Sequence, residues 1–189
     1  MFTHLIIVIC IIVFVYIHFI SKLDKTDCAM RLGAFYPPNV KNRHEYYRII
    51  TCHFIHIDFI HCFMNCYCIY SLGGFFENLL GTIPYLLLIF VSMITSSLMT
   101  LSASEVSSEA NHTITLGASG IFYGYLGALI ALAVLLGGAF ADLLSQFMMV
   151  IVLNVLFTLT SPSTSKFGHL GGALGGFIAI VLLRLVGFL

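Results

Sequence analysis

The stretch TLGASGIFYGYLGALIALAVLL, residues 115–136, is apolar along nearly its whole length and long enough to cross a lipid bilayer. It carries one serine, Ser119, between small residues near its N-terminal end. A serine in such a segment usually bonds to its own helix backbone. A chemical role for Ser119 therefore requires a partner from elsewhere in the chain.

The composition of the whole chain predicts a membrane protein. Its 189 residues are 60% hydrophobic and 8% charged, with a mean hydropathy of +1.05. A soluble domain of this length cannot bury so much apolar side chain. Eight basic residues balance eight acidic ones, so nothing in the charge indicates a nucleic-acid partner, and the expected surroundings are a lipid bilayer.

Hydropathy predicts one all-α membrane domain over residues 1–189, built as a bundle of six transmembrane helices. The expected spans are residues 5–20, 56–76, 84–101, 117–136, 143–159 and 167–189. The long first loop covers residues 21–55, and residues 101–115 are expected to form a second polar loop. The first span has no basic segment before it and no small-residue cleavage site, so we expect it to be retained.

Counting the crossings places the polar residues of three spans at one face of the membrane. Spans two, four and six all start on the side of the long first loop. The strongly polar residues near the starts of these spans are His56, Asp58, His61, Asn65, Ser119 and His169. Polar groups inside spans are costly and by default mark function.

Small residues predict that spans four and six pack closely. His169 is followed by Gly172 and Gly176, three and seven residues later, on one helix face. Small residues on such a face let two helix backbones approach each other. Span four offers matching small positions at Gly117, Gly120, Gly124 and Gly127. This packing would bring His169 to Ser119.

A hydroxyl beside an imidazole is the simplest activated nucleophile, because the base removes the proton that keeps serine unreactive. Acyl transfer also needs donors aimed at the developing oxyanion. The Ser119 backbone N–H, the His61 ring and the Asn65 amide, the last two on one helix face, could supply them. The one acidic residue after position 115 is Asp142, at a loop, so we expect a Ser–His dyad without a third carboxylate.

A metal site is the main competing interpretation. CHFIHIDFIHC, residues 52–62, holds three histidines and two cysteines, residue types that bind zinc. His56 and His61 are five apart and point to different helix faces, and no HExxH or CxxC motif is present. We therefore expect neither a metal nor another cofactor. Whether Cys28 and Cys52, which flank the first loop, form a disulfide is left open.

Three separated motifs resemble those of the rhomboid intramembrane serine proteases. GASG, residues 117–120, is similar to their GxSG nucleophile motif, and GHLGGALGG, residues 168–176, to their HxxGxxxG helix. HIDFIHCFMN, residues 56–65, matches their HxxxxHxxxN segment. EYYRIIT (45–51), SLGGFFE (71–77) and the six-span order extend the resemblance over nearly the whole chain, with Tyr47–Arg48 where the family has Trp–Arg.

The resemblance implies a serine endopeptidase that cleaves in or near the transmembrane segments of single-span proteins. Ser119 would be the nucleophile and His169 the base, with Tyr123 as the aromatic that packs on the base. His56, His61 and Asn65 would support the site. The resemblance also implies that the site faces the extracytosolic or lumenal side, whereas the positive-inside rule would place the first loop, with six of the eight Lys and Arg residues, in the cytosol.

Two other functions are considered beside the protease. One is a proteolytically inactive rhomboid-like protein that binds membrane clients. The presence of both Ser119 and His169 argues against this function. The other is a small transporter, for which paired half-helices or a charged pathway would be expected. Within the protease hypothesis, the short loop 161–165 is expected to act as a mobile cap that admits water.

Overall fold

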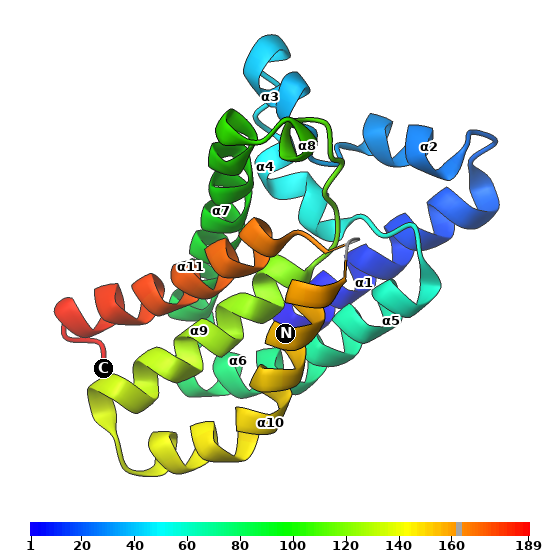
Figure 1. Cartoon of the computed structure of the whole chain (residues 1–189). Helices are drawn as coiled ribbons and strands as arrows, with labels where there is room; N and C mark the ends of the chain where they lie inside the picture. The colour runs from blue at the N-terminus through cyan, green and yellow to red at the C-terminus, as the bar shows by residue number, and fades with distance from the viewer. Residues whose placement is uncertain (162–163) are drawn as a thin grey trace.

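The computed structural model describes residues 1–161 and 164–189, and six of its helical segments are long and apolar enough to cross a membrane (Figure 1). They are Phe2–Ile20, Phe59–Leu80, Thr82–Val106, Ser119–Leu136, Ala139–Thr160 and Lys166–Leu185. The first consists of α1 (Phe2–Val15) and a π-helical turn, Tyr16–Ile20. The second joins α5 (Phe59–Cys68) and α6 (Gly74–Leu80) through a π-helical turn, Ile69–Gly73. The chain is thus an integral, multi-pass all-α bundle.

The other four spans are single helices: α7 (Thr82–Val106), α9 (Ser119–Leu136), α10 (Ala139–Thr160) and α11 (Lys166–Leu185). Helix α9 is central, because 67% of its residues are buried. In α10 only 6% of the residues in the most apolar stretch are buried, so this helix lies at the periphery. Figure 1 shows α9 running between α11 and α10. The main core surrounds α9 and includes the buried side chains of Phe76, Tyr85, Tyr125, Leu129 and Leu132.

Glycines allow α9 and α11 to approach to backbone contact. A Cβ added to Gly172 would lie 3.0 Å from the backbone C and Cα atoms of Gly120. A Cβ on Gly176 would lie 2.6 Å from the backbone C of Gly124. Neither contact could be relieved by a side-chain rotation, because the opposing atoms belong to the backbone. Glycine at these positions therefore sets the distance between the two helices.

The first loop folds into short helices that cover one end of the bundle. These are α2 (Lys25–Leu32), α3 (Pro37–Arg43), α4 (Arg48–Thr51) and the 3₁₀ turn Cys52–Phe54. The Asp24 carboxylate caps α2 by accepting the backbone N–H of Thr26. Gly33 ends the same helix in the left-handed region at φ 105°. Local capping signals thus give this polar segment a defined structure.

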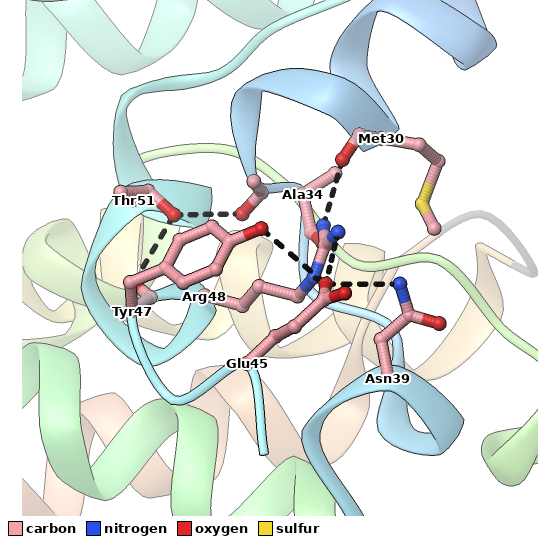
Figure 2. Close-up of polar contacts among 8 residues, drawn as sticks. Met30, Ala34, Asn39, Glu45, Tyr47, Arg48 and Thr51 are labelled. Atoms are coloured by element: carbon pink, nitrogen blue, oxygen red, sulfur yellow. Dashed lines mark hydrogen bonds and ion pairs between the residues drawn. The ribbon is translucent and has the colours of Figure 1, made fainter. Parts of the chain in front are cut away.

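Arg48 holds the first loop together from a buried position (Figure 2). Its Nη1 donates to the carbonyl oxygens of Met30 at 2.8 Å and Ala34 at 2.6 Å, and its Nε donates to Glu45 at 2.5 Å. The guanidinium hydrogen bond holds the pKa of the Glu45 carboxyl below its usual value. The neighbouring Tyr47 side chain is half exposed and donates to the same carboxylate. At least one cation of this loop therefore serves its internal packing.

The predicted loop over residues 101–115 is wrong in part, because α7 continues to Val106 and a short α8 (Ser108–Asn111) follows. Polar residues do not end α7: the Ser102 and Ser104 hydroxyls donate to carbonyls of their own helix. Only the end of the segment is extended, where Phe35 and Thr115 exchange two backbone hydrogen bonds of 2.9 and 2.8 Å. That bridge ties the first loop to the start of α9.

The Cys28 and Cys52 thiols are both free. Each is buried in a different small cluster, Cys28 against Ile17, Ala29, Ala34 and Ile55, and Cys52 against Phe35 and Val40. Cys28 behaves here as a small apolar side chain, whereas the Cys52 thiol also contacts the Ile49 carbonyl and the Ser97 hydroxyl.

Candidate active site

Ser119 is the first residue of α9 and follows a tight turn. Gly117 adopts φ +112°, a conformation that side chains other than glycine rarely tolerate. Its N–H donates to the Cys52 carbonyl at 3.0 Å, which fixes the turn against the first loop. The Ser119 hydroxyl then lies 2.9 Å from Nε2 of His169. Two residues fifty positions apart thus meet at hydrogen-bonding distance.

His169 is held in the first turn of α11, where only 8% of it is exposed. The ring of Tyr123, one turn after Ser119 in α9, stacks on the imidazole with centroids 4.1 Å apart and planes inclined by 14°. The other imidazole nitrogen, Nδ1, lies 2.8 Å from Oγ1 of Thr158 in α10. Side chains from two neighbouring helices, α9 and α10, therefore fix the histidine, and the contact with Thr158 was not predicted from the sequence, where only a carboxylate was sought as third member.

The polar residues of span two point to the turn that precedes Ser119. Asp58 caps α5 by accepting the N–H of His61 at 2.7 Å, so the helix begins three residues later than expected. A Cβ on Gly117 would lie 2.8 Å from His61 Nε2 and 3.5 Å from Asn65 Nδ2. Both nitrogens thus border the space beside the Gly117 turn.

His56 lies outside α5 and connects this turn to Asn65. Its Nε2 accepts the backbone N–H of Ala118 at 3.2 Å and contacts the Asn65 amide nitrogen at 3.1 Å. Burial lowers the pKa of His56 to about 4, so the ring is neutral at pH 7 and the single lone pair of Nε2 is shared between the two N–H groups. The His61 ring packs edge-on against it, with centroids 5.2 Å apart. His56 therefore orients the amide of Asn65.

His53, the third histidine of the segment considered for zinc, faces a different neighbour. Its Nε2 lies 3.0 Å from the Met93 carbonyl and 3.2 Å from the Ser97 hydroxyl, both in α7. Within residues 1–161 and 164–189, no group of three or more His, Cys, Asp and Glu side chains is arranged to hold a metal ion.

A small cavity adjoins the Ser119–His169 pair on the α7 side. Its wall includes the hydroxyl-bearing side chains of Ser96, Ser97 and Thr100. Hydroxyl groups of α7 therefore line the space next to the Ser119–His169 pair. Of the loop predicted to cap the site, residues 162–163 lie outside the described part of the chain.

The sequence model of the Rhomboid domain matches residues 43–185, which include every residue placed above around Ser119 and His169. The chain belongs to the rhomboid family. The turn with its serine, the glycine-rich last helix and the histidine–asparagine segment of span two all fall within this match.

Several rhomboid relatives are similar over most of this chain. Rhomboid protease GluP of Bacillus subtilis (strain 168) is 28% identical over 97% of the chain and 35% of its own length. Rhomboid-like protease 1 of Toxoplasma gondii is 30% identical over 82% of the chain and 53% of its own length. RHOMBOID-like protein 1 of Arabidopsis thaliana is 29% identical over 78% of the chain and 37% of its own length. The chain thus spans about a third to a half of the length of these relatives.

Proposed function

We propose that this rhomboid chain is a serine endopeptidase that hydrolyses peptide bonds in or near the transmembrane segments of single-span membrane proteins. The observation that carries the proposal is the 2.9 Å contact between the Ser119 hydroxyl and His169 Nε2. Several relatives are named proteases, which supports the same reaction class. The proposed unit is a single membrane domain over residues 1–189.

In the proposed reaction, His169 Nε2 takes the hydroxyl proton while Ser119 Oγ attacks the scissile carbonyl carbon. The tetrahedral intermediate then collapses, its C–N bond breaks, and His169 gives the proton to the leaving amine. Water next attacks the Ser119 ester with His169 again as base, which releases the acid and restores the hydroxyl. Tyr123 holds the imidazole in plane for both steps through its stacked ring.

The developing oxyanion is stabilised in this proposal from the Gly117 turn. The backbone N–H of Ser119, Nδ2 of Asn65 and Nε2 of His61 are the proposed donors. Since His56 accepts one hydrogen of the Asn65 amide, the second N–H is left to point at the substrate. Gly117 itself must lack a side chain, because a Cβ there would occupy the space beside both side-chain donors.

The proposed substrate reaches the site from the bilayer at the face covered by the first loop. Spans two, four and six begin at that face, and the site residues lie in or just before the first two turns of these spans. In line with the family resemblance, we propose that this face is extracytosolic or lumenal. The Arg48 contacts support this orientation, because they give a cation of the first loop a role inside its own fold.

The test is cleavage of a single-span reporter by the purified protein in proteoliposomes. Wild type should cut the reporter, and Ser119→Ala should not. Ser102→Ala is the matched control, because it removes an exposed hydroxyl near the same end of the bundle and should leave the rate unchanged. Reporter binding without cleavage by wild type would instead favour a client-binding protein, and cleavage by Ser119→Ala would refute the assigned nucleophile.

A further inference from the structure

Helix α10 contributes one buried side chain to the bundle, and that side chain lies at the site. All residues of α10, Ala139–Thr160, are described, and among them Thr158 alone is buried. The large apolar side chains of this helix are mostly exposed, as expected for a helix that faces lipid. A hydroxyl buried on such a helix is unusual, because hydrophobic packing does not require it.

The Thr158 hydroxyl joins three helices. Its Oγ1 lies 2.8 Å from His169 Nδ1 in α11 and 2.6 Å from the Tyr123 hydroxyl in α9. It also donates to the Asn154 carbonyl, one turn earlier in α10, at 2.8 Å. The Tyr123 hydroxyl reaches the same carbonyl at 2.9 Å.

We propose that Thr158 is a positioning residue that holds His169 in the tautomer required for proton transfer. This inference rests on the proposed function, in which Nε2 of His169 accepts the Ser119 proton. Nε2 can accept only if the ring hydrogen is on Nδ1, and that hydrogen then needs an acceptor. Thr158 Oγ1 is in place to accept it.

The Asn154 carbonyl favours one direction of this hydrogen bond. A hydroxyl can donate to an imidazole nitrogen as readily as it can accept from one. If Thr158 donated to Nδ1, the ring hydrogen would move to Nε2 and face the Ser119 oxygen, which could no longer transfer its proton. Because the Thr158 hydroxyl hydrogen has the carbonyl of its own helix as partner, Oγ1 is left to accept.

A neutral hydroxyl suits this position better than a carboxylate. Thr158 lies in a transmembrane segment, where an ionised side chain carries a large desolvation cost. The hydroxyl fixes the ring orientation and the tautomer without that cost. The sequence predicts a two-residue site because no acidic residue is available as a third member. The geometry instead connects Ser119, His169 and Thr158 through two contacts of 2.9 and 2.8 Å, and the second contact depends on the position of α10.

The test compares two substitutions of Thr158 with one control in the same helix. Thr158→Val keeps the shape and removes the hydroxyl, so Nδ1 loses its acceptor; we expect kcat to fall about 10- to 100-fold with little change in KM. Thr158→Ser keeps a hydroxyl and should retain most of the wild-type rate. Thr160→Val removes an exposed hydroxyl that donates to the backbone in the same way, and it should be neutral.

A second measurement separates positioning from packing. In protein labelled with ¹⁵N-histidine, the resonances lost in His169→Gln identify His169, and their shifts report which nitrogen carries the hydrogen. Wild type and Thr158→Ser should show the Nδ1–H tautomer, whereas Thr158→Val should show a mixture. Should the valine variant fail to fold, Thr158→Ala removes the same hydroxyl without added bulk and is measured in the same way.

The outcomes distinguish this inference from the proposed function. A wild-type protein that cleaves nothing contradicts the protease, while the tautomer comparison still decides the role of Thr158. An active wild type with an equally active Thr158→Val overturns the positioning role. A slow Thr158→Val with an unchanged tautomer, or one whose defect Thr158→Ser shares, shows packing only and also overturns it.

Discussion

A single methyl group at Gly172 should misalign the Ser119–His169 pair. In Gly172→Ala, the new Cβ would lie 3.0 Å from the backbone C and Cα of Gly120, and nearer still to the Gly120 carbonyl oxygen. Carbon atoms in contact prefer about 3.5–4.0 Å, so α11 must retreat by roughly 0.5–1 Å. His169 lies one turn earlier on α11, and its 2.9 Å contact with Ser119 would lengthen beyond a good hydrogen bond.

A misplacement of about 1 Å costs about 10²-fold in rate, so Gly172→Ala should lower kcat by roughly that factor. The assay is the initial rate of reporter cleavage in proteoliposomes, with thermal unfolding in detergent as the check on folding. Gly74→Ala is the matched control, because a Cβ there meets nothing within 4 Å and its rate should equal that of wild type. A folded Gly172→Ala with normal turnover would refute the claim that the α9–α11 distance sets the reactive geometry.

Three further predictions concern the oxyanion donors, pH and metal. Asn65→Ala should lower kcat about 10²–10³-fold and still allow covalent labelling of Ser119; an effect on KM alone would contradict the assigned role. Burial lowers the pKa of His53 and His56 to about 4 from 6.5, so the unfolded chain binds more protons below pH 6.5. The unfolding temperature should therefore be constant above about pH 6.5 and fall towards pH 4, and a flat profile over that range would contradict neutral burial. Treatment with a strong chelator should leave cleavage unchanged, and a loss reversed by zinc would contradict the metal-free mechanism.

The arrangement of the spans could be predicted because lipid imposes simple rules. Apolar length predicts the crossings, and the number of crossings predicts which span starts share a face. Ser119 and His169 were therefore expected to lie at one depth before any contact was known. Glycine spacing at Gly172 and Gly176 added the pairing of spans four and six, because close backbone approach needs small residues at helical intervals.

Other features depend on geometry that hydropathy does not encode. The contact of Thr158 with His169 depends on the rotation of α10 about its own axis, and an exposed apolar helix gives little periodicity from which to predict it. Helix formation beyond Leu101 was missed because serines that bond to their own backbone resemble loop residues in sequence. The contacts of Arg48 with Met30 and Ala34 likewise depend on the path of the loop backbone rather than on any local pattern.

The assignment of Ser119 as the nucleophile is tested most directly by the site of covalent modification with a serine-directed phosphonate. The reagent is incubated with the native protein in detergent, and the adduct is located by mass spectrometry of the digested chain. If His169 activates the Ser119 hydroxyl, which lies 2.9 Å from its Nε2, we expect one adduct on Ser119 in wild type and very little in His169→Ala. An adduct on a different residue, or equal labelling of Ser119 with and without the His169 imidazole, would contradict it.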